Sequence, residues 1–250
     1  MERTSILKGI AVALALFLSV AVFGATHKQR LYQCYLTGNM ADWLVVMDEL
    51  SSEYNRTKSV ETLFALTHAQ YGYIGYLLGV DDEDRAEKLV AKALSNASVL
   101  LDKNPKWVEV LAIKGALIAY KIAMSPYKAP FLGPESVSII DKALSLDSTN
   151  PYALTEKANS KLYAPVLFGG NPKEAVLLYQ KAIASIERTL NGSKGYEWWH
   201  LNVMAQLAIA AEKSGQTELA RSSYRKILQV APNFKWVRDE LYPKFQKKNG

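Results

Sequence analysis

Apolar residues recur at i, i+4, i+7 and i+11 in five stretches of the chain, a spacing that places side chains on one face of an α-helix. The five stripes begin at Trp43, Ala86, Ser136, Ala175 and Ala220. The third stripe is the poorest, because it has Ser136 and Asp147 at its ends. We therefore expect five amphipathic helices, and we expect the third to belong to the least stable part of the fold.

A break in the helical pattern precedes each stripe. The breaks lie at 38–39, 79–82, 133–134, 169–172 and Gly215. Glycine commonly ends one helix, and a polar cap or a proline begins the next. Asn171, Pro172 and Glu174 form such a start, with a side-chain cap, a first-turn proline and an acid three residues after the cap.

Further helical runs precede four of the breaks, over 63–78, 108–122, 152–163 and 198–213. No window keeps the period-two alternation of a strand for long, so the chain is predicted to be all-α. A helix pair of this size cannot bury its own apolar face, but stacked pairs can. We therefore predict an α-solenoid of about five antiparallel helix pairs, capped by a short C-terminal helix over 235–241 that ends before Pro243.

Residues 1–25 differ from the rest of the chain. Arg3 and Lys8 precede an uncharged apolar run over 9–22, and small residues follow at Gly24 and Ala25. This pattern predicts a secretory signal peptide. The alternative is an uncleaved anchor, although the run is short for a membrane span of about 20 residues. No other segment is apolar enough to cross a membrane, so 26–250 is expected to form one helical domain in the periplasm.

The composition is that of an ordinary globular protein, with 49% hydrophobic and 22% charged residues among 250. The charges are interspersed, and together with export this argues against a nucleic-acid partner. A single cysteine, Cys34, excludes an intrachain disulfide and a multi-cysteine metal site. We expect it to be a small buried side chain.

Residues suited to catalysis are few. The sequence contains no HExxH, GxSxG or P-loop motif. His68 lies on an apolar helical run and is expected to be a hydrogen-bonded histidine in the core or in the groove. Glu197 and His200 are spaced to share a ligand, but no second cluster accompanies them. We therefore expect a protein that is not an enzyme and that uses no cofactor or metal.

Residues 206–234 resemble a tetratricopeptide repeat, with its characteristic positions at Leu207, Ala208, Gly215, Ala220, Tyr224 and Pro232. Residues 159–187 are similar. The chain also resembles exported bacterial tetratricopeptide-like proteins, a group without an agreed role, through an AP…LGP loop over 129–134 and a P…FGGxP loop over 165–172. The second loop is also similar to one in the T-component of TRAP-type periplasmic solute transporters.

The resemblance implies a non-enzymatic scaffold that binds a protein or peptide partner in a concave groove lined by the first helix of each pair. Register with the repeat pattern gives six groove candidates: Glu109, Lys157, Lys161, Asn202, Gln206 and Lys213. The three lysines would favour an acidic segment or a carboxylate. The alternative function is a soluble accessory component of a small-molecule transport system, which would need an apolar pocket.

Overall fold

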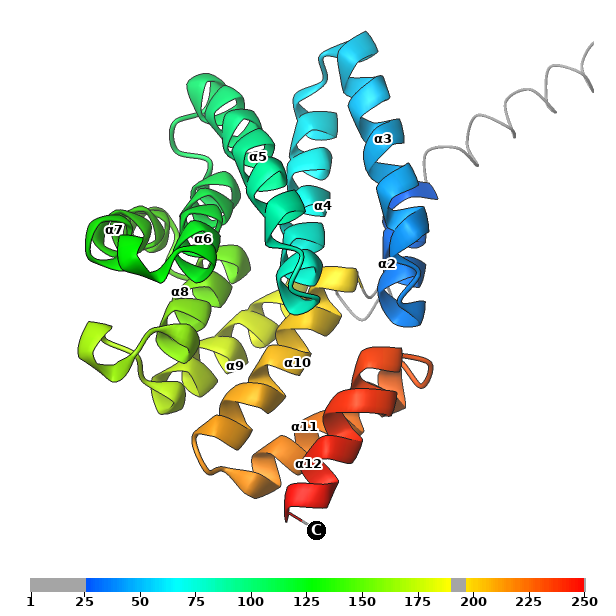
Figure 1. Ribbon diagram of the computed structural model, residues 1–250, viewed down its shortest axis with the longest axis vertical. Coiled ribbons are helices and arrows are strands. Elements are labelled where there is room, and N and C mark those ends of the chain that lie inside the picture. The colour runs from blue at the N-terminus through cyan, green and yellow to red at the C-terminus, as the bar shows by residue number, and fades with distance from the viewer. Residues whose placement is uncertain (1–25, 190–196, 250) are drawn as a thin grey trace, which may run out of the picture.

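The computed structural model describes residues 26–189 and 197–249, which form eleven α-helices and no strand (Figure 1). The α-helices are α2 (Thr26–Thr37), α3 (Met40–Thr57), α4 (Val60–Gly79), α5 (Glu83–Lys103), α6 (Val108–Met124), α7 (Ala129–Leu146), α8 (Pro151–Tyr163), α9 (Pro172–Thr189), α10 (Trp198–Lys213), α11 (Thr217–Val230) and α12 (Tyr242–Asn249). Two short 3-10 turns, η1 (Pro126–Lys128) and η2 (Val166–Phe168), follow α6 and α8, and a π-helix, η3 (Trp236–Leu241), precedes α12. The predicted signal segment, residues 1–25, lies outside the described residues.

The helices pack as five consecutive pairs, from α2–α3 to α10–α11, and each pair also packs on the next. The second helices α3, α5, α7, α9 and α11 carry the five predicted stripes, and α4, α6, α8 and α10 carry the predicted upstream runs. The sequence pattern did not predict α2, the first helix of the first pair. The all-α solenoid of five helix pairs is therefore confirmed.

The third stripe accommodates one of its two polar members, Ser136, by a local contact. Ser136 is buried, and its hydroxyl donates a hydrogen bond to the Gly115 carbonyl oxygen at 2.8 Å. Helix α7 comes this close to α6 because Gly115 has no side chain, since a Cβ there would lie 2.6 Å from Cγ1 of Ile140. The lower stability of this pair stays a prediction.

One predicted helix start is wrong. Helix α7 begins at Ala129, before the predicted break at Gly133–Pro134, and it contains both Pro130 and Pro134. Both prolines lie within its first two turns, where Pro130 replaces an N–H that has no intrahelical partner. The start of α9 follows the prediction, because the Asn171 side chain accepts a hydrogen bond from the Glu174 backbone N–H at 3.2 Å.

The C-terminal cap is longer than predicted. The chain runs from the π-helix directly into α12, so Pro243 is the second residue of α12 and not the end of the cap. A proline is tolerated in the first turn of a helix. Phe245 is buried and packs on Tyr224 of α11 with ring centroids 5.4 Å apart, so α12 covers the last helix pair.

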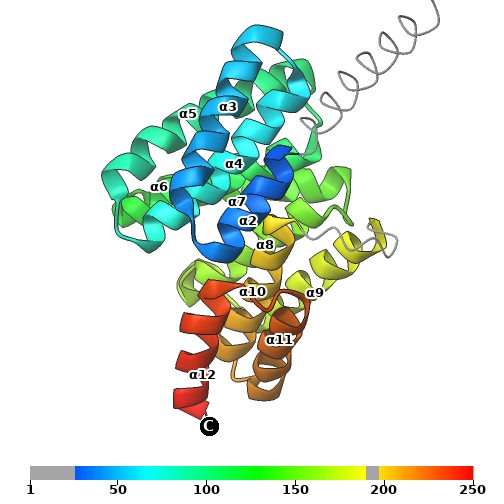
Figure 2. The same ribbon diagram turned by 90° about the vertical axis from the view of Figure 1, so that its right-hand side faces the viewer.

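The superhelix closes on itself, because α2 packs against α10 (Figures 1 and 2). Trp198 of α10 lies at the centre of this closure, with its ring centroid 5.8 Å from Tyr35, 5.1 Å from Trp43 and 4.7 Å from His68. Gly72 of α4 is needed here, since a Cβ would lie 2.6 Å from the Trp198 ring. Aromatic side chains therefore fill the inner space at this level. Within the described residues, no helix combines the length and apolarity required to span a membrane.

Candidate functional site

Helix α8 carries a row of polar and aromatic side chains on its inward-facing side. Tyr152, Glu156, Asn159 and Tyr163 are spaced i, i+4, i+7 and i+11, the same spacing as the apolar stripes. Tyr152 stacks on Trp199 of α10 with centroids 4.0 Å apart. The other three side chains are hydrogen-bonded to neighbouring helices or to each other. This row joins the first helices of several pairs.

Glu156 is the buried acid of this row. The Tyr71 hydroxyl of α4 donates to Oε1 at 2.7 Å, and the Asn159 amide donates to Oε2 at 2.8 Å. Burial raises the pKa of Glu156 to about 7, although both hydrogen bonds act to lower it. The sequence analysis missed Glu156, but its spacing from Tyr152 and Tyr163 could have indicated that it faces inward.

The row ends at an exposed tyrosine that brings two groove candidates together. Tyr163 is 55% exposed, and its hydroxyl donates to Oε1 of Gln206 at 2.6 Å. Lys213 holds its ammonium 4.8 Å from the centroid of the same ring. An aromatic face, an amide and a cation therefore lie side by side at the surface. Such a set can bind an apolar group together with a carboxylate.

The three candidate lysines differ in their partners. Lys157 pairs with Asp141 at 2.6 Å, and Lys161 pairs with Glu174 at 2.9 Å. Within the described residues, no carboxylate forms an ion pair with Lys213. Lys213 is therefore the candidate lysine best able to attract an acidic group.

The two remaining candidates, Glu109 and Asn202, are hydrogen-bonded within the chain. Glu109 accepts a hydrogen bond from the Asn150 amide at 2.8 Å. Asn202 accepts one from the Tyr35 hydroxyl of α2 at 2.9 Å, at the closure of the superhelix. For both residues, a role in partner binding stays a prediction.

His68 is buried, as predicted, but the expected hydrogen-bond partner is missing. Within the described residues, its Nε2 has no hydrogen-bond partner, and burial lowers the pKa of His68 to about 3. The ring centroids of Tyr152, Trp198 and Trp199 lie 4.7 to 6.1 Å away. The expectation was wrong for Nε2, because aromatic rings of α8 and α10 pack around the imidazole.

Other chemically suggestive residues are occupied or buried. Glu197 pairs with Lys28 at 3.0 Å, and His200 is 1% exposed. Cys34 is buried, and burial raises the pKa of its thiol to about 12, with a further contribution from a hydrogen bond to Asp42. In the part of the chain that the structure describes, no three or more His, Cys, Asp or Glu side chains are placed to hold a metal ion.

Comparison with known proteins supports the fold and leaves the activity open. No family model and no curated protein matches the sequence. Among solved structures, a thermophilic TPR protein of Thermus thermophilus is similar with a TM-score of 0.53 and 14% identity, over 89% of this chain and 98% of that one. The HusA haemophore of Porphyromonas gingivalis is similar with a TM-score of 0.51 and 16% identity, over 76% of this chain and 96% of that one. The chain therefore has a TPR-like helical fold.

Proposed function

We propose that the protein is a non-enzymatic scaffold that binds an extended segment of a partner protein on its inward-facing side, at Tyr163, Gln206 and Lys213. The observation that carries the proposal is the exposed ring of Tyr163, which is fixed by Gln206 and flanked by Lys213. A fixed aromatic ring binds at little entropic cost, because few rotamers are lost when a partner covers it. Proteins with stacked helix pairs commonly bind partners on this side of the superhelix.

The partner segment is expected to lie across the surface and not in a deep groove. Trp198, Trp199 and His68 already fill the inner space beside the first repeats. The open part is the end of the α8 row, where Lys213 adds a positive charge that no carboxylate of the described residues pairs with. A partner segment with an apolar side chain next to an acidic one fits this surface.

Cross-linking in the producing cell tests the proposal. A photo-activatable residue at position 163 should capture the partner, whereas one at position 177 should not. Leu177 is a matched control, because it is 59% exposed but lies on α9, outside this site. Lys213→Glu should raise the apparent Kd for an acidic partner, and Lys92→Glu on α5 should leave it unchanged. Equal capture at 163 and 177, or none at 163, would refute the site.

The location in the periplasm is part of the same proposal and has its own test. Residues 1–25 predict export, and cleavage after Gly24 would leave Ala25 as the first residue. The mass of the protein purified from the periplasmic fraction decides between cleavage and an uncleaved anchor. A protein found in the cytoplasm with residues 1–25 still attached would contradict export.

An accessory role in small-molecule transport is the alternative proposal. Such a role needs a cavity, and sites for small molecules usually hold about 300 Å³ or more. A hollow between α9, α10 and α11, lined in part by Ile183, Met204 and Leu207, holds about 200 Å³. This hollow is smaller than such a site and by itself gives the transport role no support.

A further inference from the structure

Helix α9 carries a second row of regularly spaced side chains on its solvent-facing side. The row is spaced i, i+4, i+7, i+11 and i+14, which places its members along one side of the helix. We call it the outer stripe, and its members, all exposed, are Lys173, Leu177, Gln180, Ala184 and Glu187. The buried residues of α9 lie on a different side of the helix. The outer stripe is therefore accessible to another molecule along its whole length.

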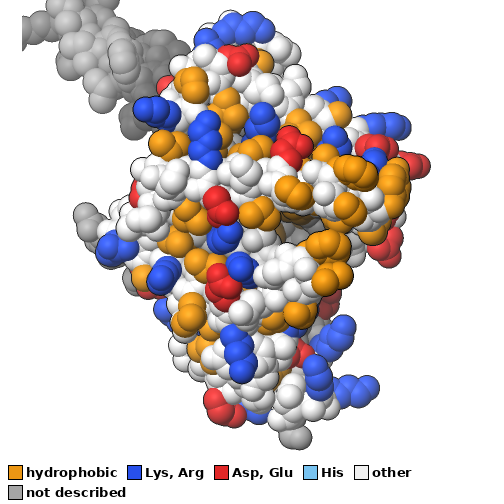
Figure 3. All heavy atoms as spheres, turned by 90° about the vertical axis from the view of Figure 1, so that its left-hand side faces the viewer, with side chains coloured by type: hydrophobic (Ala, Val, Ile, Leu, Met, Phe, Trp, Pro, Cys, Tyr) orange, Lys and Arg blue, Asp and Glu red, His pale blue; other side chains and the backbone are white. Residues whose placement is uncertain are grey.

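One half of the outer stripe borders a hollow, and an apolar side chain projects from the other half. Ala184 and Glu187 help to line the hollow between α9, α10 and α11, which holds about 200 Å³ and also has Met204 and Leu207 in its wall. Leu177, two turns earlier on α9, is 59% exposed. Figure 3 shows hydrophobic side chains gathered on the edge formed by the connections after α6 and α8, whereas Leu177 lies on α9. The outer stripe therefore combines a projecting side chain with a recess.

The outer stripe is complementary to its own reverse. Its members are, in order, a cation, a large apolar side chain, an amide, a small apolar side chain and an anion. If a second copy of α9 lies antiparallel with the two Gln180 residues opposite each other, Lys173 meets Glu187 and Leu177 meets Ala184. A two-fold axis produces each of these contacts twice. A large side chain opposite a small one also lets two helices approach closely.

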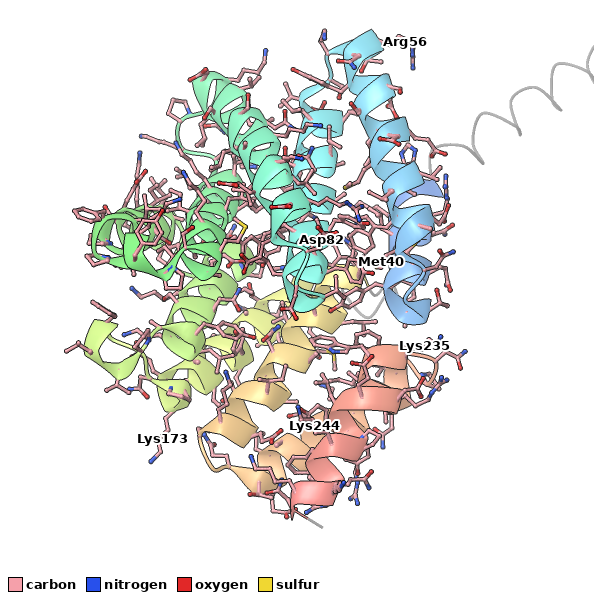
Figure 4. The ribbon with its side chains drawn as sticks, in the orientation of Figure 1. Met40, Arg56, Asp82, Lys173, Lys235 and Lys244 are labelled. Carbon is pink, nitrogen blue, oxygen red and sulfur yellow. The ribbon has the colours of Figure 1, made fainter. Side chains whose placement is uncertain are left out.

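The charged ends of the outer stripe are available for these contacts. Lys173 points away from the body of the protein (Figure 4), and it forms no ion pair within the described residues. Glu187 pairs with Lys226 through Oε1 at 3.1 Å. Within residues 26–189 and 197–249 its Oε2 takes part in no ion pair, so this oxygen can accept from the Lys173 ammonium of a second copy.

Two further cations border the outer stripe and limit its affinity. Lys181 lies about 100° around the helix from Gln180 and would stand near its own counterpart, at the rim of the contact. Arg188 would stand near Lys173 of the second copy, beyond the end of the stripe. Solvent and salt screen exposed like charges, so this repulsion is small. Because the contact uses mainly one helix of each copy, it is at the small end of protein interfaces, and the dimer should dissociate on dilution.

We propose that two copies of the chain associate around a two-fold axis at Gln180, with their outer stripes antiparallel and each Leu177 inserted into the hollow of the other copy. The outer stripe shares no residue with the site at Tyr163, Gln206 and Lys213, so either proposal can fail without the other. A photo-activatable residue at position 177 would then capture a second copy of this chain, and the mass of the product distinguishes that copy from a partner protein.

Oxidative cross-linking of the full-length protein tests the position of the axis. In a Gln180→Cys variant each new thiol meets its own counterpart, because both lie on the axis. In an Arg188→Cys variant, the matched control on the same helix, the two thiols would lie about 24 Å apart along the helices at 1.5 Å per residue. Cys34 is buried and does not compete for the oxidant. A retained N-terminal segment would bring copies together in both variants alike, so the difference between the two positions is decisive.

We expect Gln180→Cys to form a disulfide-linked dimer at least about tenfold faster than Arg188→Cys, because the dimer raises the effective concentration of the two thiols. Adding Leu177→Glu should lower the rate to that of Arg188→Cys, and adding Lys173→Glu should lower it severalfold. Sedimentation of the wild type should show a dimer that increases with protein concentration.

The proposal is wrong if positions 180 and 188 cross-link equally fast or if Leu177→Glu leaves the rate unchanged. It is also wrong if the wild type sediments as a monomer at every concentration, or if position 177 captures only another protein.

Discussion

The hydroxyl of Tyr71 donates a hydrogen bond to Oε1 of Glu156 at 2.7 Å, across 85 positions of sequence. This bond links α4 to α8, two helices that are not consecutive, inside the closed part of the superhelix. Glu156 is 3% exposed, and its raised pKa results from this burial. The stability of the fold should therefore depend on pH through Glu156 in the α8 row.

Glu156→Gln should remove a stability loss that the wild type shows as the pH rises. The folded-state pKa of Glu156, about 7, is above its ordinary value of 4.5, so between these values the folded state binds more protons than the unfolded state. Stability then falls as the pH rises through this window, by at most about 3 kcal/mol. In thermal melts, the Tm of the variant should rise relative to that of the wild type as the pH increases from 4.5 to 8. A constant difference in Tm would contradict the assignment.

His68→Phe should have the opposite effect on pH dependence. The folded-state pKa of His68, about 3, is below its ordinary value of 6.5, so the unfolded state binds the extra proton and stability falls as the pH drops below 6.5. Phenylalanine keeps an aromatic ring and removes Nε2, which has no hydrogen-bond partner among the described residues, so at pH 7 the free energy of unfolding should change by no more than about 1 kcal/mol. Below pH 6 the variant should be more stable than the wild type in urea titrations. A wild type that resists acid as well as the variant would show that His68 is protonated in the folded state.

The two groups should partly cancel in the wild type. Between pH 4.5 and 6.5, rising pH weakens the fold through Glu156 and strengthens it through His68. Each single variant removes one contribution, so their stability profiles should slope in opposite directions. The double variant should be flatter than either, and equal slopes in both single variants would contradict this explanation.

Gly170→Ala should destabilise the protein, by roughly 2 kcal/mol or more, because the added Cβ would meet the Ala164 carbonyl oxygen. Gly79→Ala is the matched control. Gly79 is the last residue of α4 and has no atom within 4 Å of an added Cβ, so alanine there should be neutral or stabilising by up to about 1 kcal/mol. Urea unfolding of both variants measures the difference. Similar losses in both would mean that the turn after α8 adapts to a side chain.

Ala220→Phe should destabilise the last helix pair. Ala220 is fully buried in α11, and a large side chain at a packed interface costs roughly 1–3 kcal/mol. Ala91→Phe on the exposed face of α5 provides the control and should change the melting temperature little. An unchanged midpoint for Ala220→Phe would show that the interface between the helices of this pair can expand.

The sequence alone determined the local structure of this protein. Helical spacing, glycines and caps placed the second helix of each pair and four of the five first helices, because these signals depend on residues within a few turns of one another. Most errors of the prediction from sequence lay at helix ends. At α7, the prolines lie in the first turns of the helix and do not mark a break before it. The stripes also indicated which residues, such as Ala175 and Ala220, are buried.

Only the tertiary structure decided which side chains meet on the inward-facing side of the superhelix. The closure of α2 on α10 through Trp198 depends on a small rotation between neighbouring pairs, which adds up over the whole chain and is not encoded in any single repeat. Within the described residues, this closure left Nε2 of His68 without a hydrogen-bond partner and brought Tyr35 to Asn202. The packing of neighbouring helices gave Lys157 and Lys161 their carboxylates. Tyr163, Gln206 and Lys213 meet because α8 and α10 are neighbours in space although their residues are up to 50 positions apart in sequence.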